Sequence, residues 1–112
     1  MTVHERCVGD VTILDVGGRI TEDGAEALRA LVQPLVRQSR VKIVFNLHDA
    51  PYLDTTALGE IVRAHVSVAR GGGGIKLLHV TPKVHEVLTI THLDSVLSEF
   101  DDEATALNSF EH

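Results

Sequence analysis

A short polar cluster, Asp54-Thr55-Thr56, is the part of the sequence best suited to chemistry. It stands between an apolar, strand-like segment that ends near residue 47 and an amphipathic segment that begins at Asp54. An aspartate at a helix N-cap accepts hydrogen bonds from first-turn amides, which stabilises a helix by about 1 kcal/mol. Thr55 would then lie near unpaired N–H groups and the positive end of the helix dipole. The pattern therefore predicts a position where a phosphate on Thr55 is tolerated.

Gly59 follows Thr55 by four residues and is expected directly above it on the same helix face. A glycine inside a helix costs roughly 1 kcal/mol relative to alanine, so a compensating role is expected. Two interpretations are open. The missing side chain leaves room for another molecule to approach the hydroxyl, with the small Ala57 adding to the opening, or Gly59 packs against a neighbouring strand. On composition alone, Thr55 and Thr56 are also consistent with ordinary helix-start residues.

Other reactive arrangements are weaker. The four glycines at 71–74 join a helix to a strand and lack the Gly-Lys-Ser/Thr of a nucleotide-binding loop, which indicates a flexible helix stop. An aspartyl phosphatase of the haloacid dehalogenase type needs a second Asp two residues after the first, where Thr56 stands. No base is identifiable for a threonine nucleophile. We expect no enzymatic activity and no cofactor.

Seven histidines raise the question of a metal site. They form no His-x-x-x-His pair and have no cysteine partner, so no metal site is predicted. His65 and His79 are expected to be buried or half-buried structural residues. The others are expected in loops or on the surface: His4, His48, His85, His92 and His112.

Length and charge limit the possible partners. The 112 residues suffice for one compact domain, 1–112. A net charge of −6, with ten scattered basic residues, argues against nucleic acid and anionic membranes and favours a protein partner with a basic patch.

The single cysteine, Cys7, fits a reducing compartment. Because no long apolar segment or signal peptide is apparent, a cytoplasmic protein without membrane insertion is expected.

Strand-like and helical segments alternate along the chain. Strands are predicted at 11–16, 41–47, 75–80 and 96–100, with another near 3–8. Helices are predicted at 21–38 and 54–70, after Thr81-Pro82, and from about Asp102, where Ala106, Leu107 and Phe110 point inward. Pro34 should kink the first helix or end it early. This order predicts an α/β fold with a four- to five-stranded mixed, largely parallel sheet and about four helices.

The helix at 54–70 has two distinct faces. Its apolar face is formed by Leu58, Ile61, Val62, Val66 and Ala69. Its polar face, expected to be exposed, is formed by Thr56, Glu60, Arg63, Ser67 and Arg70. Because the polar face continues from Thr55, it is a candidate docking surface.

Three stretches in this order resemble the STAS domain. They are VTILDVGGRI at 11–20, VKIVFNLHDAPYLDTTALG at 41–59 and GGGIKLLHVTPKV at 72–84. The likeness extends over about 11–110 and implies a STAS-like fold. The family signature is an Asp, then Ser or Thr residues, a small residue and Leu-Gly at a helix start. This chain has Thr55-Thr56-Ala57 where Ser-Ser-Gly or Ser-Thr-Gly is usual, and Thr21 where many antagonists have Asp.

The resemblance implies a bacterial anti-sigma-factor antagonist. In that group the hydroxyl residue after the Asp is phosphorylated by the anti-sigma factor, a serine kinase, and by position that residue is Thr55. The implied partners are an anti-sigma serine/threonine kinase, bound by the unphosphorylated form so that a sigma factor is released, and a cognate phosphatase. Partner binding is expected through Asp54, Thr55, Thr56, Gly59, Glu60, Arg63 and Ser67. The alternative is a STAS scaffold, or a subunit of a stress-signalling or lipid-transport complex, without a phosphorylation cycle.

Overall fold

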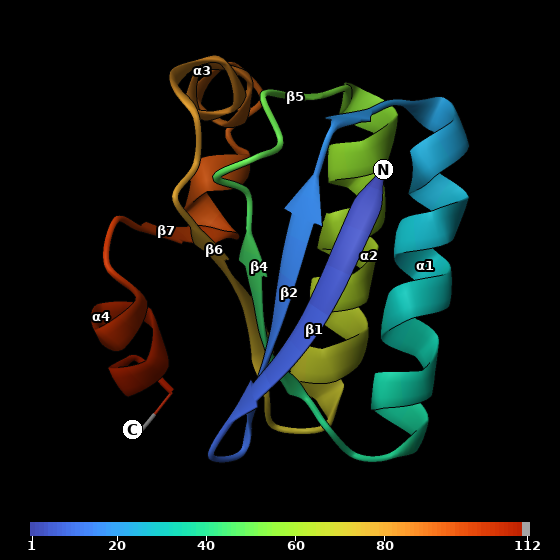
Figure 1. The fold of residues 1–112 in the computed structure, drawn as a ribbon, viewed down its shortest axis with the longest axis vertical. Helices are drawn as coiled ribbons and strands as arrows, with labels where there is room; N and C mark the ends of the chain where they lie inside the picture. Colours follow the sequence, from blue (N-terminus) through green and yellow to red (C-terminus); the bar gives the residue numbers. More distant parts are fainter. Residues whose placement is uncertain (111–112) are drawn as a thin grey trace.

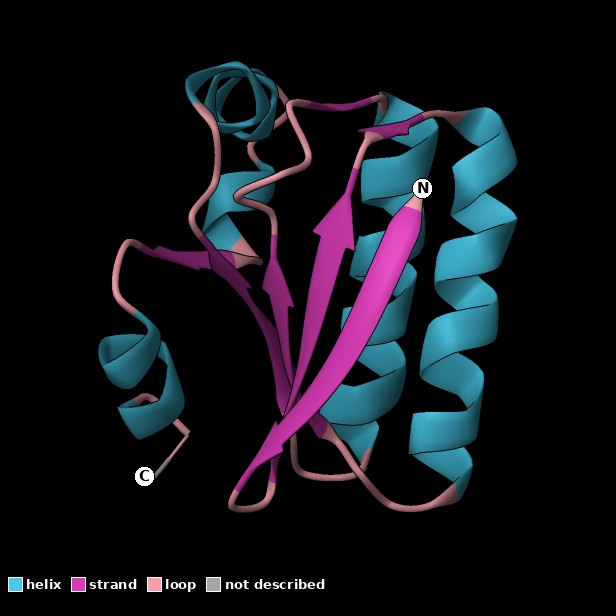
Figure 2. Ribbon diagram, in the orientation of Figure 1, coloured by secondary structure: helices cyan, strands magenta, loops and turns pink. Residues whose placement is uncertain are grey.

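The structure, a computed structural model, describes residues 1–110 and is built on a five-stranded sheet (Figures 1 and 2). The strand order is β1-β2-β4-β6-β7, with β1 (Thr2–Val8), β2 (Val11–Gly17), β4 (Lys42–Asn46), β6 (Gly74–Leu78) and β7 (Ser98–Phe100). Strand β1 is antiparallel to β2, and the other neighbours are parallel. The predicted mixed, largely parallel sheet is confirmed.

Helices cover the sheet unequally. Helices α1 (Glu22–Arg37) and α2 (Thr55–Arg70) lie side by side against one face, on the right in Figure 1, and the short α4 (Glu103–Asn108) lies on the other side. Helix α3 (Pro82–Ile90) lies near the carboxyl ends of the parallel strands and is followed by the 3₁₀ turn η1 (Leu93–Ser95). The prediction of about four helices is confirmed.

Two apolar clusters hold these layers together. The larger fills the space beneath α1 and α2 and includes Phe45, Leu14 and Ile61, all nearly or fully buried. The smaller packs α4 on the opposite face through Val44 and Ala106. Because successive strand residues point to opposite faces, Val44 and Phe45 belong to different clusters. This two-sided burial explains the nearly continuous apolar sequence of β4.

Two details differ from the sequence-based prediction. A second sheet, formed by β3 (Arg19–Ile20) and β5 (Tyr52–Leu53) in parallel, was not predicted. Of the two outcomes expected at Pro34, a kink or an early end of the first helix, the early end is wrong, because α1 continues to Arg37. Proline removes its own N–H as a donor, yet its carbonyl still accepts from the Gln38 N–H at 3.1 Å. The last turn is thereby preserved.

Candidate functional site

The predicted N-cap at the start of α2 is present in the structure. The Asp54 carboxylate accepts a hydrogen bond from the Ala57 N–H at 2.9 Å, and its carbonyl accepts one from Leu58 at 3.0 Å. Thr55 and Thr56 are the first two residues of the helix, and both are exposed. The side chain considered for phosphorylation is therefore accessible to another protein.

Two backbone donors accompany these hydroxyls. Among the described residues, no hydrogen bond joins the N–H of Thr55 or Thr56 to an acceptor. Both groups lie at the positive end of the α2 dipole, where negative charge is stabilised. The corner can therefore accept an added anionic group without losing an existing hydrogen bond.

Gly59 lies one turn beyond Thr55, and a Cβ placed on it would have no atom within 4 Å. The interpretation that Gly59 packs against a neighbouring strand is therefore wrong. The interpretation of Ala57 as part of the opening is also wrong, because Ala57 is fully buried in the main core. Of these two small residues, only Gly59 leaves open space beside the Thr55 hydroxyl.

The small β3–β5 sheet fixes the position of the N-cap. Ile20 pairs with Leu53, and the next residue, Asp54, donates its backbone N–H to the Ile20 carbonyl at 3.0 Å. On the same small sheet, the Arg19 guanidinium lies 4.6 Å from the centre of the Tyr52 ring. The loop before α1 and the start of α2 are thus joined into one surface.

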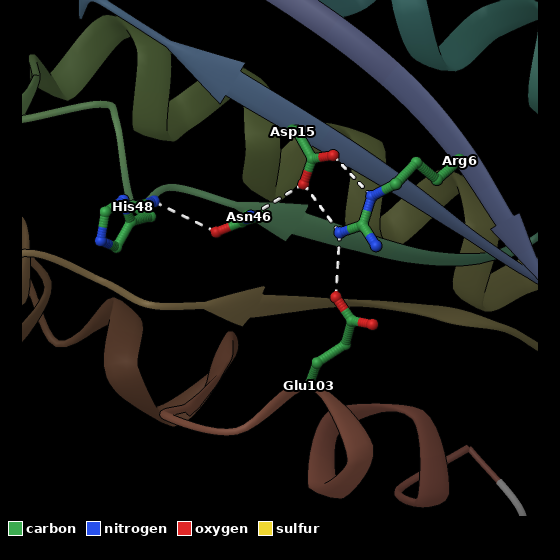
Figure 3. A network of polar contacts seen from close by, with 5 residues as sticks. All are labelled: Arg6, Asp15, Asn46, His48 and Glu103. Atoms are coloured by element: carbon green, nitrogen blue, oxygen red, sulfur yellow. Dashed lines mark hydrogen bonds and ion pairs between the residues drawn. The ribbon is translucent and has the colours of Figure 1, made fainter.

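A polar network on the other side of the sheet supports the loop that leads to this corner (Figure 3). Asp15 accepts hydrogen bonds from Arg6 at 2.6 Å and from Asn46 at 2.8 Å, and Arg6 also contacts Glu103 of α4 at 2.9 Å. The Arg6 guanidinium holds the pKa of the Asp15 carboxyl below its ordinary value. Asn46 in turn accepts from the His48 N–H, at the start of the loop between β4 and β5. Sequence analysis did not identify this network.

The predicted polar face of α2 needs one correction. Glu60 is not exposed: only 6% of it is accessible, because it lies between α1 and α2 and contacts two arginines. Arg29 donates to its carboxylate at 2.8 Å and Arg63 at 3.1 Å. The Arg29 hydrogen bond, more than any other influence, lowers the pKa of Glu60. Thr56, Arg63, Ser67 and Arg70 are exposed as predicted.

The predicted apolar face of α2 is also rotated relative to the observed one. Leu58 and Ile61 are buried as expected, but Val66 is 46% exposed and Ala69 is exposed. Val68 is fully buried instead. The inward direction of the second half of α2 is set by its contacts with β6 and α1, which the helical spacing alone does not determine.

Comparison with known proteins identifies the family. The sequence model of the STAS domain matches residues 2–106. The chain belongs to the STAS domain family. The anti-sigma F factor antagonist of Paenibacillus polymyxa is 24% identical to it over 102 residues, which cover 90% of this chain and 87% of that protein.

Two solved structures are similar to this STAS domain in fold. The crystal structure of a candidate anti-sigma factor antagonist from Thermotoga maritima has a TM-score of 0.91 and 26% identity, covering 98% of this chain and 95% of that one. The Bacillus cell fate determinant SpoIIAA in its phosphorylated form has a TM-score of 0.74 and 16% identity, covering 96% of this chain and 98% of that one. The latter likeness shows the fold alone.

The remaining predictions for this STAS domain concern its glycines and histidines. The predicted helix stop at the glycines is observed, with Gly71 as the C-cap of α2 and Gly72 in the left-handed region at a φ of +89°. His65 and His79 are half-buried as predicted, whereas His112 lies outside the described residues.

Within residues 1–110, no three His, Cys, Asp or Glu side chains converge as metal ligands. No helix among the described residues is long and apolar enough to cross a bilayer.

Proposed function

We propose that this STAS domain is an anti-sigma-factor antagonist controlled by phosphate on Thr55. The unphosphorylated form binds an anti-sigma serine/threonine kinase in the cytoplasm, and a sigma factor is thereby released. Phosphorylation of Thr55 by that kinase ends the interaction, and a cognate phosphatase restores it. The observation that carries the proposal is the exposed Thr55 side chain at the first position of α2, directly after the Asp54 N-cap.

The surroundings of Thr55 support access by a kinase. The free space beside Gly59 allows another chain to come close to the helix backbone one turn from the hydroxyl. The glycine has no packing role that would explain its cost of roughly 1 kcal/mol in a helix. The relative from Paenibacillus polymyxa is named as an antagonist of an anti-sigma factor, and SpoIIAA has been solved in a phosphorylated form. Both names agree with the proposal.

The energetics favour a change in binding over a change in fold. A phosphate on Thr55 adds about −1.5 to −2 charges. Attraction to the α2 N-terminus contributes up to roughly 1–2 kcal/mol. Repulsion from Asp54 in a water-like dielectric is of similar size, about 1 kcal/mol. Since these effects nearly cancel, the domain keeps its fold and the dianion acts on the partner, where it removes contacts and must be desolvated.

The first test is phosphorylation. The protein is incubated with an anti-sigma kinase from the same genome and ATP, and the modified residue is located by mass spectrometry. We expect phosphate on Thr55, none in Thr55→Ala, and unchanged incorporation in Thr56→Ala. The Thr56 variant is a matched control because its side chain is the adjacent exposed hydroxyl on the same helix turn.

The second test is binding. We expect Thr55→Glu to bind the kinase at least tenfold more weakly than wild type, which corresponds to about 1.4 kcal/mol. Thr55→Ser should bind as wild type does. If the chain acquires no phosphate and Thr55→Glu binds with wild-type affinity, the phosphorylation switch is contradicted. A constitutive STAS scaffold is then the function to pursue.

A further inference from the structure

A groove of about 500 Å³ runs between α1 and α2, the two neighbouring helices of Figure 1. Its apolar floor includes Val32, Val36 and Ala64. Its polar lining consists of Arg29, Gln33, Arg37, Glu60, Arg63 and Ser67. This combination of an apolar floor and a charged rim suits an amphipathic segment better than a small polar molecule.

The groove is cationic although the whole chain carries a net charge of −6. Glu60 is the only acid in its lining, and its carboxylate is shared between Arg29 and Arg63. Those two side chains remain 50% and 75% exposed, so their outer N–H groups can still reach a ligand. Arg37, also exposed, forms no ion pair with any described residue. Three guanidinium groups and one buried carboxylate therefore line the groove.

We infer that this groove receives an acidic, helical segment of the same anti-sigma partner, an inference that rests on the proposed function. Arg29 and Arg37 are eight residues apart on α1, about 12 Å along its axis. Carboxylates two turns apart on one face of a partner helix match that spacing, with apolar residues between them on Val32 and Val36. Arginine is well suited to such contacts because its fork binds carboxylates bidentately.

The position of the groove fits an interface that also covers Thr55. Arg63 lies eight residues beyond Thr55 on α2, about 12 Å along the helix. A standard interface buries about 800 Å² on each partner, equivalent to a disc of about 16 Å radius. A partner centred on Thr55 therefore reaches the near half of the groove, and the inferred helical segment continues from there to Arg37 at the far end. The net negative charge of this domain attracts a basic surface of the partner, whereas the groove accepts an acidic segment of the same partner. These opposite charges on the partner fix its orientation in the complex.

Arg37→Glu tests the inference without disturbing the buried carboxylate, because Arg37 is not bonded to Glu60. We expect this variant to bind the kinase about tenfold more weakly, with a smaller difference at high salt. The matched control is Arg70→Glu, which makes the same charge change at an exposed residue of α2 outside the groove lining. It should bind with nearly wild-type affinity, and both variants should melt at similar temperatures.

Hydrogen exchange on the partner identifies the bound segment. We expect protection of a helix rich in Asp and Glu, and loss of that protection with Arg37→Glu. Equal weakening by both charge reversals, no weakening by either, or protection of basic segments alone overturns the groove inference and leaves the Thr55 switch intact. If wild type and Thr55→Glu bind equally, or neither binds, the proposed function fails and the groove inference fails with it.

Discussion

The backbone N–H of Asp54 donates to the carbonyl oxygen of Ile20 at 3.0 Å, which joins two segments 34 positions apart in the sequence. The same residue caps α2 through its side chain. Asp54 therefore has two independent functions: its backbone extends the pairing of β3 and β5, and its carboxylate holds the first turn of the helix. The orientation of Thr55 depends on both.

Asp54→Ala should lower the free energy of unfolding by about 1 kcal/mol, because the Ala57 N–H loses its acceptor. For a domain of this size, the midpoint of thermal unfolding should fall by about 4 °C. Asp54→Asn is the control, since an asparagine oxygen caps a helix about as well. Urea unfolding measures both variants, and equal stability of Asp54→Ala and wild type would contradict the cap.

Two glycines should respond to alanine in opposite directions. Gly59→Ala should raise the free energy of unfolding by up to about 1 kcal/mol, because alanine favours the helix and its Cβ meets no atom within 4 Å. Gly73→Ala should destabilise the domain strongly, because its Cβ would overlap the Val41 carbonyl oxygen. Under the proposed function, Gly59→Ala should also weaken kinase binding. A destabilised Gly59→Ala would show that this position is packed after all.

The strands and long helices could be predicted because their signals are local. Segments 11–16, 41–47 and 75–80 are short apolar runs rich in β-branched residues, and 54–70 repeats apolar residues at helical spacing. The Asp54 N-cap is likewise visible in sequence, since the capping residue precedes the first helical turn directly. These features do not depend on knowing which elements pack together.

The missed features depend on contacts between distant segments. Strands β3 and β5 contain two residues each, too few for any periodicity. The burial of Glu60 requires Arg29, which lies 31 residues away on another helix. Glu60 follows Thr56 by four residues, which in sequence is the spacing of an exposed polar face. Its burial becomes apparent only when α1, which carries Arg29, is placed beside α2. The exposure of Val66 has the same origin.

The contacts of Glu60 predict that substitutions of Arg29 and of Glu60, the two partners of this ion pair, change the free energy of unfolding by different amounts. Arg29→Leu should cost more stability than Glu60→Gln, because it leaves a carboxylate that is 6% exposed with only Arg63 beside it. Removal of the carboxylate charge leaves two arginines that are at least half exposed and can be hydrated. Urea midpoints of both single variants and the double variant measure the coupling. A larger loss in Glu60→Gln would contradict this account.

His65 predicts a loss of stability at mildly acidic pH. Burial lowers the pKa of its imidazole below the ordinary 6.5, and the charge of Lys76 acts in the same direction. In addition, Nδ1 accepts the Ile75 N–H at 3.0 Å, which requires that nitrogen to be unprotonated. As the pH falls below about 6.5, the unfolded chain takes up this proton more readily than the folded one. The free energy of unfolding should therefore decrease from pH 7 toward pH 5.5 and level off below the folded pKa.

The comparison needed is with His65→Gln, which retains an acceptor for Ile75 but cannot titrate. Urea unfolding at pH 7.0 and 5.5 should give a larger loss of stability in wild type than in this variant. His85 works in the opposite direction, because the Glu99 carboxylate raises the pKa of His85 and their contact strengthens as the pH falls. Since both proteins contain that pair, it cancels in the difference. Equal pH dependence in the two proteins would mean that His65 is protonated as easily in the folded state as in the unfolded chain.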